Sequence, residues 1–140
     1  MVRLHGTEKF YSLGKRVGQA VKADIVLAFT EEPLYSSKFK KAEFLFGEAN
    51  RPLETCIVSL APIREEFYGR TRDDSLLLQR LLKETLHELG HQLLRTMNHC
   101  ENPTCAMAYA PDVAAVDKKQ VNFCPACREK LTQLHATFNL

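Results

Sequence analysis

The motif HELGH at residues 87–91 contains side chains whose types and spacing suit a metal ion. Residues four apart lie on one face of an α-helix, so His87 and His91 can direct both imidazoles at one ion. Glu88 projects about 100° further round the helix axis and flanks the ion without binding it. Two histidines and one further protein ligand leave a fourth zinc position for water, whose pKa then falls to about 7. The motif predicts a catalytic zinc with Glu88 as the general base of peptide-bond hydrolysis; the alternative is a helix with two solvated or core histidines.

Four of the five cysteines form two closely spaced pairs, C-x4-C and C-x2-C, with eighteen residues between the pairs. They are Cys100, Cys105, Cys124 and Cys127. Such spacing is typical of a closed tetrahedral zinc site made of four thiolates, which has no position for water. We therefore predict a structural zinc that fastens the last third of the chain; the alternative is four buried thiols. The fifth cysteine, Cys56, is expected to be a small core residue of a strand.

His99 and Cys100 are neighbours in the sequence. In an extended segment neighbouring side chains point to opposite sides. His99 could then reach the HELGH zinc while Cys100 reaches the cysteine zinc. The sequence predicts two zinc ions per chain on this interpretation, one catalytic and one structural.

The hydrophobic pattern around these motifs indicates both helices and strands. Predicted helices cover residues 9–23, a run from about Ser75 with leucines at helical spacing, a short segment at 112–120, and a last helix ending by about Phe138. Thr71, Asp73 or Asp74 could cap the HELGH helix. Predicted strands cover residues 25–30, 43–46 and 56–60. The expected fold class is α/β of the α+β type, a mixed sheet packed on one side by two helices, with a cleft between it and a smaller C-terminal part.

Length and composition restrict the remaining choices. A chain of 140 residues suits a single domain over residues 1–140, with the sheet and active-site helix in 1–97 and the C-terminal part in 98–140. A net charge of +2 gives no large single-sign field for nucleic acid or an anionic membrane. The longest apolar runs are far too short to span a bilayer, and residues 1–10 lack the apolar stretch of a signal peptide. We predict a cytoplasmic protein, a monomer by default, without a membrane or nucleic-acid partner.

The order of these motifs resembles the archaemetzincins, a family of zinc-dependent metzincin-clan peptidases with the pattern HExxHxxGxxHC-x4-C-x-M-x17-CxxC. FLFGEA at 44–49, EFYG at 66–69 and LKE at 82–84 add softer similarities. The resemblance implies a zincin-like fold, a peptide or protein substrate, and His87, His91 and His99 as ligands of the catalytic zinc. It also implies that Glu88 is the general base and Met107 the methionine of the turn beneath the metal. Tyr109 resembles a turn tyrosine of other metzincins that can contact the oxyanion; an ordinary partly buried tyrosine is the alternative.

The chain departs from the family pattern in three places. The family has glycine three residues after the second histidine and the third ligand three residues later, where this chain has Leu94 and Met97. Because glycine there allows a positive φ, we expect Asn98 to take the left-handed conformation and the helix to run about half a turn longer. Sixteen residues, one fewer than in the family, separate Met107 from Cys124. The resemblance further implies that the N-terminal strand and helix of the family are missing.

Three functions therefore stay open at this point. The first is a zinc metallopeptidase of the metzincin type. The second is a catalytically inactive relative that keeps only the structural zinc, because Leu94 and the shifted His99 have altered the site. The third is a zinc-ribbon-like binding module; against nucleic acid, residues 100–127 hold three acidic residues and only Lys118 and Lys119 as basic ones.

Overall fold

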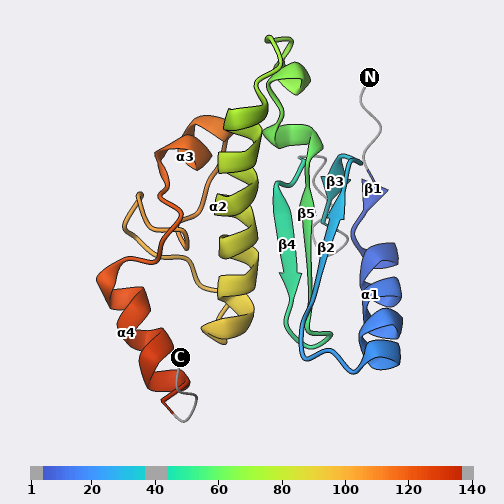
Figure 1. Ribbon diagram of the computed structural model, residues 1–140, viewed down its shortest axis with the longest axis vertical. Coiled ribbons are helices and arrows are strands. Elements are labelled where there is room, and N and C mark those ends of the chain that lie inside the picture. Colours follow the sequence, from blue (N-terminus) through green and yellow to red (C-terminus); the bar gives the residue numbers. More distant parts are fainter. Residues whose placement is uncertain (1–4, 37–43, 137–140) are drawn as a thin grey trace.

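The computed structural model describes residues 5–36 and 44–136. Its central sheet has three strands in the order β2-β5-β4 (Figure 1). Strand β2 (Val26–Thr30) pairs in parallel with β5 (Thr55–Ser59), and β4 (Gly47–Asn50) pairs antiparallel with β5. A smaller parallel pair joins β1 (His5–Gly6) to β3 (Leu34–Tyr35). The mixed sheet agrees with the prediction, and β4 forms one of its edges.

The two long helices, α1 (Glu8–Val21) and α2 (Asp74–Leu93), cover opposite faces of the central sheet (Figure 1). Side chains alternate between the two faces of a strand. Ile57 of β5 packs with Tyr11 of α1, whereas the neighbouring Cys56 donates a hydrogen bond from its thiol to the backbone carbonyl of Glu88 in α2. The prediction of two helices on one side was wrong. All five residues of β5 are buried, so the central strand needs cover on both faces.

Helix α2 begins where the sequence predicted. Of the three candidate caps, Asp73 is the residue whose carboxylate accepts the backbone N–H of Leu76, which satisfies one of the free donors of the first turn. Two short 3-10 helices, η1 (Ala61–Ile63) and η2 (Glu65–Tyr68), connect β5 to α2. Apart from Gly90, the buried positions of α2 are polar: Arg80, Lys83, Glu84, His87, Glu88 and His91. This helix therefore buries a face of functional groups.

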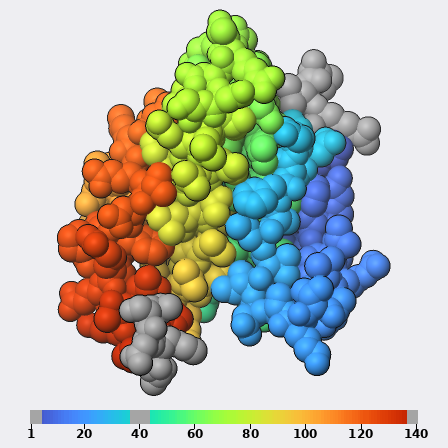
Figure 2. Space-filling view, in the orientation of Figure 1, coloured from blue at the N-terminus to red at the C-terminus, as the bar shows by residue number. Residues whose placement is uncertain are grey.

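The C-terminal part lies on the side of α2 away from the sheet. It contains α3 (Val113–Lys118) and α4 (Pro125–Leu134), and Figure 1 shows α2 between these helices and the strands. In Figure 2, α2 forms a green to yellow band between the orange C-terminal segments and the blue N-terminal ones. Leu94, Met107 and Phe123 belong to a small core there, together with buried cysteines. The C-terminal end of α2 thus lies between the central sheet and the core of the C-terminal part.

Other sequence predictions had mixed outcomes. The predicted strands at 25–30 and 56–60 and the short helix at 112–120 are confirmed within about two residues. The strand predicted at 43–46 was wrong, because the edge strand begins only at Gly47; Leu45 forms a single bridge with Leu34, and residue 43 lies outside the described residues. The last helix ends at Leu134; residue 138, its predicted end, lies outside the described residues. Within the described ranges, every helix is too short or too polar to cross a membrane.

Candidate active site and second metal centre

Three histidines meet at the C-terminal half of α2. One ring nitrogen from each of His87, His91 and His99 lies within 4.8 Å of the others. The Nε2 atoms of His87 and His91 are 3.2 Å apart. Two nitrogens bound to one tetrahedral zinc at the usual bond length lie about 3.3 Å apart. The geometry of these two imidazoles therefore suits a zinc ion without rearrangement.

Backbone carbonyls determine which nitrogen of each ring faces this centre. The Nδ1 atom of His87 lies 2.7 Å from the carbonyl oxygen of Ala106, and that of His91 lies 2.8 Å from the carbonyl of Thr96. Because a carbonyl only accepts, each Nδ1 must carry the proton, and each Nε2 keeps its lone pair. Two lone pairs 3.2 Å apart repel each other unless a cation lies between them. Burial also lowers the pKa of His87 well below its usual value and lowers that of His91, which keeps both rings neutral.

A tight turn after α2 brings His99 back to the centre. The backbone N–H of Thr96 donates to the carbonyl of His91 and that of Arg95 to Gln92, the hydrogen-bond pattern of a Schellman motif. Arg95 occupies the left-handed position with φ of 52°. The expectation that Asn98 takes this conformation was wrong. The helix needs its left-handed residue directly after its cap, Leu94, and Arg95 is that residue.

Glu88 lies in the same cavity as the three histidines. Its side chain approaches the edge strand where Gly47 leaves room; a Cβ on Gly47 would lie 2.8 Å from the Glu88 Oε1 atom. Burial raises the pKa of Glu88 well above its usual value, and the charge of Glu84 adds to this effect. Sequence reasoning missed Gly47, although a glycine at the start of a strand is a signal of close approach.

The cavity has a volume of about 950 Å³. Its walls include Phe44, Phe46, Ala110 and Pro111, and Met97 and Tyr109 also line it. Tyr109 is 66% exposed, and its ring centroid lies 5.4 Å from that of His99. The phenol of Tyr109 therefore borders the cavity next to one histidine.

A charged network, which sequence reasoning missed, joins α2 to α3 and to Lys119, the residue directly after α3. Arg80 donates two hydrogen bonds to the carboxylate of Asp117, at 2.7 and 2.8 Å, and others to Glu65 and the carbonyl of Ile63. Lys119 forms an ion pair with Glu84, and both line the cavity. The spacing of Arg80 and Glu84, four residues apart on one helix face, was the available signal.

The four cysteines form the second centre. The Sγ atoms of Cys100, Cys105, Cys124 and Cys127 lie within 4.8 Å of one another. The Sγ atoms of Cys100 and Cys124 are 3.7 Å apart, too far for a disulfide and close to the separation of about 3.8 Å in a tetrahedral zinc site.

Backbone N–H groups are directed at these sulfurs. Cys105 Sγ accepts from the backbone N–H groups of Met107 and Cys124. The N–H of Cys127, in the first turn of α4, lowers the pKa of Cys124 to about 7. Donors of this kind stabilise thiolates, the form that binds metal.

Met107 lies in the core beneath the HELGH motif. It is 1% exposed, and its Sδ atom would lie only 2.2 Å from a Cβ placed on Gly90. Met107 follows Ala106, whose carbonyl orients His87. Met107 is therefore packed directly against α2, the helix that carries His87 and His91.

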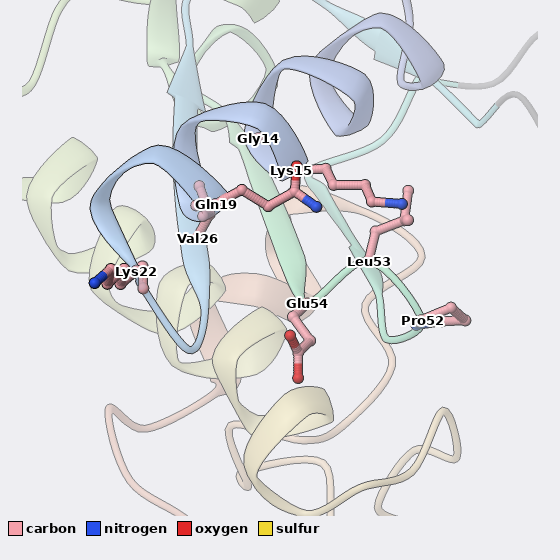
Figure 3. Close-up of a pocket in the computed structure, with 10 residues that line it drawn as sticks. Gly14, Lys15, Gln19, Lys22, Val26, Pro52, Leu53 and Glu54 are labelled. Atoms are coloured by element: carbon pink, nitrogen blue, oxygen red, sulfur yellow. The ribbon is translucent and has the colours of Figure 1, made fainter.

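A second hollow, of about 330 Å³, lies between α1 and the turn before β5. Figure 3 shows Lys15 and Gln19 of α1 and Glu54 of the turn around it. None of the histidines or cysteines described above lines it. The three histidines and Glu88 line the other cavity.

Comparisons with known proteins agree with this geometry. The model of peptidase family M54 matches residues 4–133. The archaemetzincin of Thermococcus kodakarensis is 37% identical over 82% of this chain and 59% of its own length, and that of Methanocaldococcus jannaschii is 40% identical over 77% and 58%. A zinc-dependent peptidase from Methanocorpusculum labreanum superposes with a TM-score of 0.74 at 32% identity, over 88% of this chain and 70% of its own. The archaemetzincin from Methanopyrus kandleri gives 0.67 at 30% identity, over 88% and 65%. The present chain thus spans about three fifths of the length of the first two relatives.

Proposed function

The chain belongs to peptidase family M54, the archaemetzincins, and on that premise we propose that it is a zinc-dependent metallopeptidase that hydrolyses peptide bonds in the cavity beside α2. The observation that carries the proposal is the pair of Nε2 atoms 3.2 Å apart, with both Nδ1 atoms bonded to backbone carbonyls. In this proposal His87, His91 and His99 hold the catalytic zinc. Bound there, Zn²⁺ supplies Lewis-acid activation of the peptide carbonyl and of the attacking water.

The remaining steps fall to residues of the chain. Glu88 takes the proton of the attacking water and returns it to the leaving amine, so it acts as general base and then as general acid. Burial raises the pKa of Glu88, and a stronger base accepts the proton of water more readily. Tyr109 borders the cavity and could donate a hydrogen bond to the developing oxyanion. Met107 provides the packed floor beneath the histidines.

We propose further that Cys100, Cys105, Cys124 and Cys127 bind a second, structural zinc. The 3.7 Å sulfur separation and the backbone donors to Cys105 support this assignment. Four thiolates leave no position for a substrate, so this ion would stabilise the C-terminal part only.

Zinc per chain tests the metal assignment. We expect two zinc ions in the wild-type protein and about one in His99→Ala, both prepared without added metal and measured by elemental analysis. A single ion in both proteins would leave only the cysteine centre, and the chain would then be the catalytically inactive relative. The matched variant Cys127→Ser should lose the other ion.

A quenched-fluorescence peptide library tests the chemistry. We expect cleavage by the wild type and a loss of about 10²-fold or more in Glu88→Gln, which keeps the size of the side chain and removes the base. Equal activity of the two proteins would refute the role of Glu88.

A further inference from the structure

A buried ion pair lies within the cavity that holds the three histidines. Lys119 Nζ is 3.2 Å from Glu84 Oε1, and the two side chains are only 1% and 4% exposed. Glu84 is one helical turn before Glu88 on α2, and Lys119 directly follows α3. Phe44, Phe46, Ala110 and Pro111 line the same cavity. We call these two residues the Lys119–Glu84 pair. Two further carboxylates line the cavity: Glu48 accepts hydrogen bonds from Thr7 and Tyr11, and Glu88 is assigned to the proton transfers.

Lys119 uses only part of its hydrogen-bonding capacity. An ammonium group has three N–H donors. Among the residues that the structure describes, one N–H is directed at Glu84, and the other neighbouring polar atom is His87 Nδ1, at 3.4 Å. That nitrogen carries a proton for the carbonyl of Ala106 at 2.7 Å, so it has no lone pair to offer. Donor capacity of Lys119 therefore remains for a group that enters the cavity.

The charge of the pair restricts what that group can be. Lys119 and Glu84 neutralise each other, so a charged substrate side chain would bring a third, unbalanced charge into a buried place. An apolar side chain would leave the free donors of Lys119 without acceptors. A carboxamide is neutral and offers both an acceptor for Lys119 and donors for Glu84. Its methylene groups would pack against the apolar walls.

On these grounds, and resting on the proposed function, we propose that the Lys119–Glu84 pair determines substrate specificity by selecting a glutamine or asparagine side chain next to the scissile bond. The carbonyl oxygen of the amide accepts from Lys119, and its NH₂ group donates to Glu84. Both residues act on the substrate side chain, and neither takes part in the proton transfers assigned to Glu88.

The test uses the zinc-loaded full chain and quenched peptides that differ at one position flanking the scissile bond. Each flanking position carries Gln, Glu, Lys or Met in turn, and methionine is the apolar match for glutamine in length. We expect kcat/KM for the glutamine peptide to exceed that for the methionine peptide by about tenfold or more at one position, because the site leaves buried donors unpaired with methionine. Equal or faster cleavage of the Met, Glu or Lys peptides would overturn the proposal.

Two variants separate specificity from folding. The double variant Glu84→Met/Lys119→Met removes both charges together and should reverse the preference towards methionine. Lys83→Met is the matched control: this buried lysine donates to the carbonyl of Asp117 and does not line the cavity, so the glutamine preference should remain. An unchanged preference in the double variant would refute the assignment. The wild-type series decides the matter even where the double variant does not fold.

Binding distinguishes this proposal from the proposed function. Fluorescence anisotropy with the Glu88→Gln variant measures affinity for labelled Gln and Met peptides without hydrolysis. Preferential binding of the Gln peptide without any cleavage by the wild type would refute the peptidase function and keep the specificity. Cleavage by the wild type without a Gln preference would support the peptidase function and refute the specificity proposed for the Lys119–Glu84 pair.

Discussion

Replacing Gly90 by alanine tests whether the packing beneath the HELGH motif controls both stability and metal binding. The new Cβ would lie 2.2 Å from Met107 Sδ and 3.0 Å from Phe123 Cε1. Neither neighbour has free space, since both side chains are at least nine-tenths buried. Overpacking of this kind costs up to about 3 kcal/mol, and alanine regains about 1 kcal/mol of helix propensity. We therefore expect the free energy of unfolding to fall by about 2 kcal/mol.

The same substitution should weaken the histidine centre. Moving Met107 shifts the preceding carbonyl of Ala106, which accepts the Nδ1 proton of His87 at 2.7 Å. Losing such an orienting contact lowers metal affinity by about 10–100-fold. Urea unfolding measures the first effect, and zinc competition with a chromophoric chelator measures the second. In a double-mutant cycle with Met107→Ala, the two changes should couple favourably by at least about 1 kcal/mol. A Gly90→Ala protein as stable as the wild type, with unchanged zinc affinity, would refute the reasoning.

Further predictions concern the network, the turn and the effect of pH. Arg80→Met should lower the free energy of unfolding by about 1.5–3 kcal/mol in a urea titration, because it removes the hydrogen bonds to Glu65 and Asp117 but leaves two partly solvated carboxylates. The exposed pair of Arg72 with Asp74 provides the control, and Arg72→Met should cost less than about 1 kcal/mol. Arg95→Gly should raise the melting temperature, since glycine adopts φ of 52° without the roughly 1 kcal/mol strain of other residues; a similar rise in Arg95→Ala would contradict that cause. Acidification should release the histidine-bound zinc with a midpoint below pH 6.5, because burial lowers the pKa of His87 and the ring stays neutral to lower pH. Dialysis at stepped pH followed by elemental analysis measures the midpoint. A midpoint above pH 6.5 would oppose the assignment.

The sequence predicted which residues of the site lie together better than it predicted their environment. Helical spacing predicted that His87 and His91 meet, because residues four apart on a helix are neighbours. The family resemblance added His99, and the two cysteine pairs, with spacing similar to that of known zinc sites, indicated the four-cysteine cluster. The leucine pattern predicted α2 correctly but does not show which side is buried. Leu78 and Leu82 are 56% and 46% exposed, whereas Arg80 and Glu84 are buried. A helix that lines a site buries the groups that serve it.

Long-range partners explain the remaining errors. In the sequence Lys119 was only one of the two positive charges in the local charge balance of residues 100–127. Its partner Glu84 is 35 residues away, so the sequence did not indicate the ion pair. The strand at 43–46 was predicted from its apolar residues, yet the chain pairs at Gly47–Asn50, where small residues fit under α2. The left-handed residue was assigned to Asn98 from its intrinsic tolerance, whereas the helix end determined that Arg95 takes it. The division of the domain into residues 1–97, with the sheet and active-site helix, and 98–140, the C-terminal part, stays a prediction.

The adjacency of His99 and Cys100 has a consequence for the order of metal loading. One peptide bond joins a member of each cluster, and the backbone N–H of Cys100 also donates to the carbonyl of Met107. Under the two-zinc proposal, filling the cysteine cluster anchors the backbone of residue 100 and so removes most of the conformational freedom of the neighbouring imidazole. The entropy of positioning the third histidine is then lost in advance, and the second ion binds more tightly than it would to the unloaded chain. The two centres become thermodynamically linked, and depletion of the structural ion weakens the catalytic one by the same factor.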